Sequence, residues 1–233
     1  MQDIKSDKAP RHIGFILDGN RRWAKEQGLP KLEGHRVGYD NLKTIADAAF
    51  ERGVEYVSAY IFSTENWNRT KTEVNYLMKL SHRMIVKDNR EINKKGIKLR
   101  WLGSENEVSK KLLMEIKKSE DTTKNNTKGT LALCFNYGGH REIAETLKKL
   151  VARGVTEDDI TEELIRDNIY CSDIPDVDLV VRTSGEQRIS NFMLWRVAYS
   201  ELYFTDKKWP EFSVEDLDLA INEYRNRARR FGG

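Results

Sequence analysis

Short apolar runs typical of β-strands alternate along this chain with stretches whose apolar residues recur at helical spacing. Such alternation favours parallel strands, because each intervening helix returns the chain to the same end of the sheet. We therefore predict one α/β domain with a mostly parallel central sheet flanked by helices. The strands are expected at residues 13–17, 54–62, 98–102, 130–135 and 178–182.

Helices are predicted from the same periodicity and from residues that commonly cap helix starts. Ser104 with Glu107, and Ser213 with Asp216, are each spaced as a capping box. The polar stretch 117–129 is rich in Lys, Thr and Asn, so we expect a surface loop there. The helices are expected at residues 20–27, 38–50, 72–93, 140–151, from 161 onwards, and from 213 to about 230.

The composition bounds the class of protein. With 233 residues, 39% hydrophobic and 33% charged, the chain suits one domain over residues 1–233, with the polar residues 1–11 as a flexible start. We find no signal peptide and no apolar run near the ~18 residues of a membrane span. The net charge of +3 does not indicate a nucleic-acid partner. Cys134 and Cys171 lack metal-ligand spacing, so we expect reduced thiols and a cytoplasmic location.

The first predicted strand is followed by Asp18, Gly19, Asn20, Arg21 and Arg22. The glycine permits a tight turn, and the helix that begins there would point free N–H groups and its positive dipole end outward. Arginines offer bidentate donors to phosphate, and an aspartate at a strand end is placed to bind Mg²⁺ that itself binds diphosphate. The alternative is an ordinary capped turn with solvated arginines.

Two more predicted strands end in loops that combine arginine with hydroxyl or amide side chains. Phosphate recognition and a capped helix start explain the loop 63–69 about equally well, whereas two arginines around a glycine in the loop 182–190 indicate an anion pocket. Ligands bind beyond the carboxyl ends of parallel strands, so three such loops predict a site for two phosphorylated groups. The side chains concerned are Ser63, Thr64, Glu65, Asn66, Trp67, Asn68, Arg69, Arg182, Thr183, Ser184, Arg188 and Ser190.

Two further residues are ambiguous by themselves. Glu201 lies among the aromatic residues of the segment 199–204, where a carboxylate is either paired with a cation or a metal ligand. The pattern there favours a structural pair. His35 follows a glycine near a predicted helix start and is better explained, alone, as a surface or capping residue.

Together these loops resemble the cis-prenyltransferase family, whose bacterial members include undecaprenyl diphosphate synthase. The resemblance runs in order through nearly the whole chain. It implies the fold of that family and a Mg²⁺-dependent condensation of isopentenyl diphosphate with an allylic diphosphate such as farnesyl diphosphate, which makes a new cis double bond. The matching segments are residues 12–24, 62–69, 136–140, 178–186, 188–192, 201–204 and 229–233.

The resemblance also implies residue roles. Asp18 would hold Mg²⁺ and assist departure of the allylic diphosphate, and Glu201 would be the second Mg²⁺ ligand. Asn66 matches a residue associated with proton removal from the isopentenyl unit; an amide is a poor base, so we expect it to position the proton acceptor. Contacts to the allylic substrate would come from Gly19, Asn20, Arg21, Arg22, Trp23, His35 and Trp67. Contacts to isopentenyl diphosphate would come from Arg182, Arg188, Ile189 and Ser190, and the mobile loop would be lined by Ser63, Thr64, Glu65 and Arg69.

Three positions depart from the pattern common in the family. Arg21 stands where bacterial members often have glycine, and adds charge to the phosphate loop. Lys31 stands where many have arginine, so the substrate contact it would make keeps charge but loses bidentate geometry. Ile61 stands where alanine is frequent, and a bulkier tunnel wall there would shorten the product. The growing apolar chain needs an apolar tunnel. Six residues could either line that tunnel or pack in the ordinary core: Ile61, Val74, Leu77, Met78, Ile85 and Leu133.

The resemblance also suggests a context. The product would be undecaprenyl diphosphate or a shorter cis-polyprenyl diphosphate for a cell-envelope lipid carrier. The protein would be a homodimer with the Glu201 region near the interface, and its apolar product implies transient contact with the inner face of the membrane. A Mg²⁺-dependent phosphohydrolase is an alternative, but no general base is evident beyond Asp18 and Glu65. A non-catalytic partner subunit would have lost the first loop, which here is intact.

Overall fold

The computed structural model of the protein describes residues 9–227, so most of the expected flexible start and the matching segment 229–233 lie outside the described residues. Six parallel strands form one sheet in the order β3-β4-β2-β1-β5-β6, which confirms the predicted parallel α/β architecture. The strands are β1 His12–Ile16, β2 Tyr56–Ser63, β3 Ile97–Leu102, β4 Gly129–Tyr137, β5 Leu179–Arg182 and β6 Glu201–Phe204.

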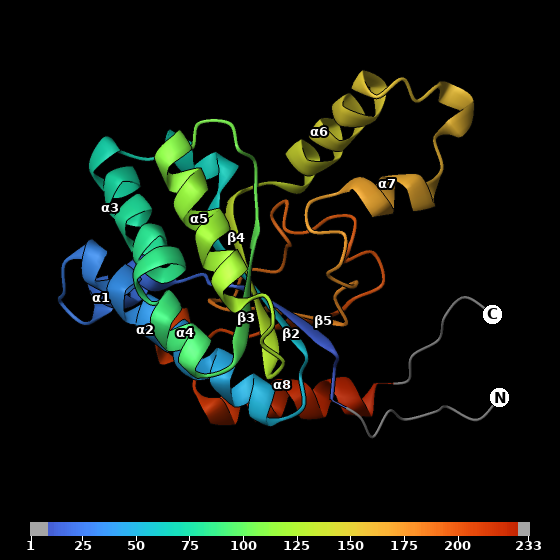
Figure 1. Cartoon of the computed structure of the whole chain (residues 1–233). Helices are drawn as coiled ribbons and strands as arrows, with labels where there is room; N and C mark the ends of the chain where they lie inside the picture. Colours follow the sequence, from blue (N-terminus) through green and yellow to red (C-terminus); the bar gives the residue numbers. More distant parts are fainter. Residues whose placement is uncertain (1–8, 228–233) are drawn as a thin grey trace.

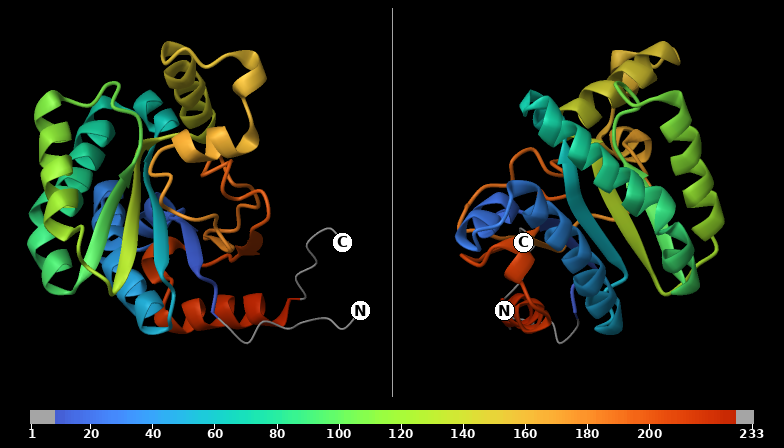
Figure 2. Two further views of the ribbon diagram at one scale, coloured as in Figure 1. Left: turned by 45° about the vertical axis from the view of Figure 1, so that its right-hand side comes forward. Right: turned by 90° about the vertical axis from the view of Figure 1, so that its left-hand side faces the viewer.

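The two faces of the sheet are covered differently (Figures 1 and 2). One face packs against most of the helices, whereas the other is covered largely by the irregular segments 169–178 and 183–200 on either side of β5. The alternation of side chains along β1 explains the division, because Ile13 and Phe15 enter the larger core and Ile16 enters the smaller one. The α-helices are α1 Asn20–Glu26, α2 Lys31–Glu51, α3 Lys71–His82, α4 Asn89–Lys94, α5 Lys110–Thr123, α6 Gly139–Ala152, α7 Glu162–Asn168 and α8 Val214–Asn226.

The second helix, α2, begins at Lys31, seven residues before the predicted start. Its first turns contain Gly34 and Gly38, which weaken the helical signal of the sequence. Both glycines face α1: a Cβ on Gly34 would lie 2.0 Å from the carbonyl oxygen of Asn20, and a Cβ on Gly38 would lie 2.1 Å from the Asn20 Oδ1. Close packing of α1 on α2, which carries His35 to the site, therefore requires these glycines.

Three other expectations about helices are wrong. The predicted helix 72–93 is interrupted by a π-helical turn, Arg83–Lys87, between α3 and α4. Ser104 and Glu107 form no capping box; the N-cap of α5 is Ser109, whose Oγ accepts from the Leu112 N–H at 3.2 Å. The stretch 117–129 is helical as far as Thr123. The box formed by Ser213 and Asp216 at the start of α8 is confirmed.

Candidate active site

The loops after β1, β2 and β5 meet at the carboxyl edge of the sheet. Parallel pairing aligns the strand ends, with Ile16 of β1 beside Arg182 of β5. Three adjoining cavities open there, and Leu17 and Arg69 line all of them. The sequence thus anticipated the convergence of three loops, because strand direction alone brings them together.

The first loop makes a tight turn at Gly19. Gly19 has φ of 99°, a left-handed conformation that glycine adopts without steric cost, and a Cβ there would lie 2.7 Å from the Ser184 Oγ. The turn lets Asp18 Oδ1 accept from the Gly19 N–H at 2.7 Å, while Asp18 Oδ2 accepts from Arg182 Nη2 at 3.0 Å. With its side chain 32% exposed, Asp18 still offers carboxylate oxygen to the cavities.

One cavity, which we call the cationic cavity, has a volume of about 550 Å³. Five cationic side chains and one carboxylate line it, together with the amide of Asn20 and the ring of His35, so its chemistry suits a polyanion such as a diphosphate. Arg22 lies 3.4 Å from Asp18 and 3.1 Å from Glu186, which joins this cavity to the loop after β5. The cations are Arg21, Arg22, Lys25, Lys31 and Arg69.

His35 lies at the inner wall of the cationic cavity, with a side chain only 9% exposed. Burial, together with the positive charge of Arg69, lowers the pKa of His35 to about 4, so the ring is neutral at pH 7 and offers one N–H. Its Nε2 is buried without a hydrogen-bond partner and lies 3.5 Å from Glu73. A neutral ring with an unsatisfied nitrogen is suited to contact an oxygen of a bound diphosphate.

Glu73, on the first turn of α3, is a site residue that the sequence analysis missed. Its carboxylate accepts from Arg69 at 2.7 Å and lies 3.6 Å from Arg21. Although burial raises the pKa of Glu73, Arg69 and Arg21 together hold it below the ordinary value, so the group is ionised. The spacing of four residues between Arg69 and Glu73 was the available signal.

The second cavity, the central cavity, has a volume of about 520 Å³ and connects all three loops. Arg182, which is 3% exposed, does not line this cavity but bonds to Ser190 and Asp18, which do. Its Nη1 donates to Ser190 Oγ at 2.7 Å and to the carbonyl oxygen of Arg188. Arg182 Nε is buried with no partner. The residues from the three loops are Asp18, Ser63, Glu65, Asn66, Arg69, Ser190 and Asn191, with His140 at the start of α6.

Asn191 is a second missed residue, and it fastens the loop after β5. Its Nδ2 donates to Glu65 Oε1 at 2.8 Å, and its Oδ1 accepts from the backbone N–H of His140 at 2.8 Å. Asn66 is similarly committed, because its Oδ1 accepts from the Ser63 N–H at 3.1 Å. Asn66 lines both the central cavity and the third one, so its amide lies between them.

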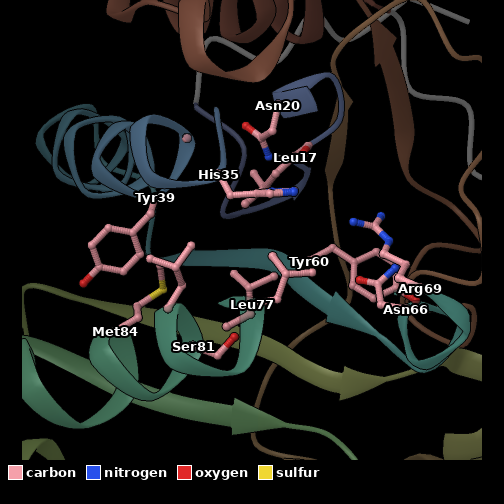
Figure 3. Close-up of a pocket in the computed structure, with 13 residues that line it drawn as sticks. Leu17, Asn20, His35, Tyr39, Tyr60, Asn66, Arg69, Leu77, Ser81 and Met84 are labelled. Atoms are coloured by element: carbon pink, nitrogen blue, oxygen red, sulfur yellow. Dashed lines mark hydrogen bonds between the residues drawn. The ribbon is translucent and has the colours of Figure 1, made fainter. Parts of the chain in front are cut away.

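The third cavity, the inner pocket, has a volume of about 110 Å³. Figure 3 shows Leu77, Ser81 and Met84 on one side of it and Tyr39 and His35 of α2 on the other. Of the six candidate tunnel residues, Ile61 and Leu77 line this pocket. Val74, Ile85 and Leu133 are buried in the core, and Met78 lies in a separate groove. A cavity wall and a packed core have the same apolar residues, so the sequence did not separate them.

Several predicted residues lie apart from the cavities. Trp67 is partly buried, packs edge-on against Phe62 and donates through Nε1 to Asn136 Oδ1 at 2.8 Å. Trp23 lies partly buried on α1, and Ile189 packs against the smaller core. Thr64 belongs to the 3₁₀ turn that follows β2, and Arg188 is largely exposed and paired with Glu186.

Glu201 is at the opposite end of the sheet from Asp18. It begins β6, where it pairs in register with Leu179 of β5, which in turn pairs with Ile13 of β1. Its carboxylate is bound by Arg227 Nη1 at 2.9 Å. Within one chain, Glu201 is therefore a cation-paired residue, and it does not share a metal ion with Asp18.

Comparison with known proteins agrees with this geometry. Residues 16–232 match the prenyltransferase family model of undecaprenyl diphosphate synthase. An isoprenyl transferase of Fusobacterium nucleatum is 47% identical over 96% of both chains. A trans,polycis-polyprenyl diphosphate synthase of Thermobifida fusca, specific for (2Z,6E)-farnesyl diphosphate, is 44% identical over 96% of this chain and 81% of its own. Lavandulyl diphosphate synthase from Lavandula x intermedia, in complex with dimethylallyl diphosphate, has a TM-score of 0.90 and 33% identity, covering 97% of this chain and 99% of its own.

A parallel sheet with a cationic cavity beside Asp18, at the carboxyl ends of its strands, suits an enzyme that acts on diphosphates. The chain belongs to the undecaprenyl diphosphate synthase family of prenyltransferases, and it is an isoprenyl transferase. The resemblance read from the motifs is thus confirmed. The relatives above are transferases and diphosphate synthases, so the comparisons give no support to a phosphohydrolase.

Proposed function

We propose that this enzyme condenses isopentenyl diphosphate with an allylic diphosphate, farnesyl diphosphate in the first instance, to build a cis-polyprenyl diphosphate. The observation that carries the proposal is the meeting of the cationic and central cavities at Asp18, with the inner pocket beside both. The cationic cavity would take the allylic diphosphate, and the loop after β5, beside the central cavity, would take isopentenyl diphosphate. The inner pocket would then receive the growing apolar chain.

In the reaction, the bond between C1 of the allylic substrate and its diphosphate breaks, and C1 bonds to C4 of isopentenyl diphosphate. A proton then leaves C2 of the isopentenyl unit. Arg21, Arg22, Lys31 and neutral His35 would bind the departing diphosphate as its charge develops, which lowers the barrier. The Gly19 and Asn20 backbone at the start of α1 supports the same role.

The second substrate would be held by the loop after β5. Arg182, with its free Nε, and Arg188 and Ser190 would bind the diphosphate of isopentenyl diphosphate. Ile189 would support this loop by packing on the smaller core. The amide of Asn66 lies between the central cavity and the inner pocket, where it would orient the group that accepts the proton.

The loop after β2 would order around the bound substrates. Ser63, Glu65 and Arg69 line the central cavity, and Thr64 lies beside them in the 3₁₀ turn. Trp23 and Trp67 would support the allylic chain from the partly buried positions described above. The hydrogen bond from Asn191 to Glu65 would link this loop to the loop that holds the second substrate.

The donor set around Asp18 fits Mg²⁺. This ion is often bound by one or two carboxylates and by substrate phosphates, and Asp18 opens onto the cationic cavity where such phosphates would lie. No group of three or more His, Cys, Asp or Glu side chains within residues 9–227 could hold a metal by itself. A bound Mg²⁺ would neutralise the leaving diphosphate.

We further propose a homodimer with the Glu201 region at its interface. β6 is an edge strand, and Tyr199 beside it is 81% exposed, while Leu202 within it is 37% exposed. Such residues are commonly covered by a partner chain. If Glu201 is a Mg²⁺ ligand, as the family resemblance suggests, the Asp18 that it joins would belong to the other copy.

Product length is expected to depend on the inner pocket. Its volume of about 110 Å³ is below the roughly 300–1,000 Å³ typical of ligand pockets, so long chains require its wall to move. Ile61 lies in that wall and supports a product shorter than undecaprenyl diphosphate. We expect Ile61→Ala to lengthen the product by at least one isoprene unit, measured by mass spectrometry; an unchanged product distribution would contradict this role.

The biological role proposed is synthesis of a lipid carrier for the cell envelope, by a cytoplasmic enzyme that contacts the inner face of the membrane. Within residues 9–227, no helix is long and apolar enough to cross a bilayer. The test of activity is incubation with farnesyl diphosphate, labelled isopentenyl diphosphate and Mg²⁺. Label in a butanol-extractable product supports the proposal, whereas phosphate release without elongation, or no reaction, would overturn it.

A further inference from the structure

A fourth hollow lies between α3 and α5, which are side by side (Figures 1 and 2). We call it the basic groove; its volume is about 730 Å³. The reaction as described above uses none of its charged residues. Its lining consists of Arg36, Tyr76, Met78, Lys79, Leu80, His82, Arg83, Lys87, Ser109, Lys111, Leu112 and Glu115.

The rim of the basic groove is strongly cationic. Five arginines and lysines line it, against one carboxylate, Glu115, which is already bound by His82 Nε2 at 3.0 Å. Lys79, Lys87 and Lys111 are exposed, and none has an ion-pair partner within the described part of the chain. Three unpaired cations around one groove give a local positive field that the net charge of +3 does not reveal.

The floor of the same groove is apolar. Met78, Leu80 and Leu112 lie there with the ring of Tyr76. Met114 is 68% exposed and follows Lys111 by one helical turn, so it adds an apolar side chain beside the cationic rim. Cations around an apolar surface are the pattern by which peripheral proteins bind anionic lipid bilayers.

The basic groove also adjoins the inner pocket. Leu80 of α3 lines both, so the proposed chain-binding pocket and the groove share part of their walls. A product released past this wall would meet whatever surface the groove contacts. A nucleic acid or an acidic protein would match the rim, but would leave the apolar floor and its position next to the inner pocket without a role.

We propose that the basic groove docks the enzyme on a membrane surface rich in anionic phospholipids, with Lys79, Lys87 and Lys111 contacting lipid phosphates and the apolar floor contacting acyl chains. This deepens the proposed function, since it names the surface through which an apolar product would reach the bilayer. Docking itself does not require catalysis, so the two proposals fail separately.

The test is co-sedimentation of the full chain with vesicles of phosphatidylcholine, with and without one-third phosphatidylglycerol. We expect binding to the anionic vesicles only, weakened by added salt. Lys79→Glu/Lys87→Glu/Lys111→Glu should reduce the affinity at least about tenfold. The matched control is Lys94→Glu/Lys124→Glu/Lys148→Glu, which changes the net charge equally on exposed lysines of other surfaces and should keep the affinity within about twofold.

Equal losses in the two triple variants would overturn the proposal, because binding would then follow net charge alone. Absence of wild-type binding, or equal binding to neutral vesicles, would overturn it as well. Turnover of water-soluble substrates is measured in parallel, with circular dichroism to confirm folding. A chain that binds vesicles without elongating farnesyl diphosphate would refute the proposed function and leave the docking surface standing.

Discussion

Two arginine–carboxylate pairs in this enzyme have the same separation and opposite surroundings. Arg182 lies 3.0 Å from Asp18, and Arg196 lies 3.0 Å from Glu142. The guanidinium of Arg196 is fully enclosed and also donates to three backbone carbonyl groups, whereas Arg182 keeps a buried Nε without a partner. Asp18 is 32% exposed at two cavities, and Glu142 is fully buried.

The difference separates a pair that is closed to ligands from one that is open to them. We call Arg196–Glu142 the closed pair and Arg182–Asp18 the open pair. The closed pair connects α6 to the segment that follows α7, because Glu142 also accepts from Tyr137 Oη at 2.5 Å and from the Tyr170 N–H at 3.2 Å. Every nitrogen of the Arg196 guanidinium and both oxygens of Glu142 have hydrogen-bond partners within the protein, so the pair is closed to a ligand. The open pair leaves hydrogen-bonding capacity toward the substrate cavities, which is what a site that binds and releases anions requires.

The largest expected effect comes from breaking the closed pair. Arg196→Met leaves the Glu142 carboxylate buried without its cation, and we expect a loss of about 3–5 kcal/mol in the free energy of unfolding. Urea denaturation measures it, and turnover per folded molecule should stay near wild type. The double variant Arg196→Met/Glu142→Leu should recover part of the loss; a single variant as stable as wild type would show that the pair is not structural.

Breaking the Arg182–Asp18 pair should affect catalysis more than stability. Asp18→Asn removes the carboxylate that faces both cavities, and we expect kcat to fall about 10²- to 10³-fold. The asparagine keeps an oxygen that can accept from the buried Arg182, so the loss of stability should be about 1–2 kcal/mol, less than for Arg196→Met. Steady-state kinetics and thermal unfolding measure the two effects. Asp158→Asn, on an exposed turn far along the chain, is the control; an active Asp18→Asn enzyme would refute the assigned role.

The buried His12, near Arg196, should make the protein sensitive to acid. His12 is fully buried between Ser58 and the Pro175 carbonyl; burial, with the charge of Arg196, lowers its pKa to about 4 from 6.5. Between these pH values the unfolded chain binds a proton that the folded chain does not, so the free energy of unfolding decreases as pH falls from 6.5 to 4. The contribution is roughly 2–3 kcal/mol.

Urea denaturation across this pH range measures that dependence. His12→Gln should lower stability at pH 7 but flatten its decline in acid. If the slope of His12→Gln equals that of wild type, other groups cause the acid sensitivity.

The smallest expected effect lies at the rim of the open pair. Arg188 is 60% exposed and paired with Glu186, so Arg188→Lys keeps the charge and loses bidentate geometry. We expect the KM for isopentenyl diphosphate to rise up to about tenfold, with the KM for the allylic substrate unchanged. Initial-rate kinetics with each substrate varied in turn measure this. Equal changes in both KM values would mean that Arg188 does not distinguish the two sites.

Local patterns in the sequence were sufficient for the strands and for the three loops at their ends. Alternation and strand direction are short-range properties, and they bring Asp18, Asn66 and Ser190 to one edge without further information. The motifs also identified the family. They failed at α2, where Gly34 and Gly38 look unfavourable to a helix until α1 is seen packed against them.

The sequence by itself therefore determined the fold class, the family and the three loops that meet at the carboxyl edge of the sheet, because these depend on residue type and spacing along the chain. Only the tertiary structure decided which arginine has a partner for every nitrogen and which keeps one nitrogen free. Arg196 and Arg182 have the same chemistry and differ in their surroundings. The tertiary structure also placed Glu201 at the far end of the sheet, and Lys79, Lys87 and Lys111 around one groove. Such placements arise from contacts between distant segments, which no local pattern encodes.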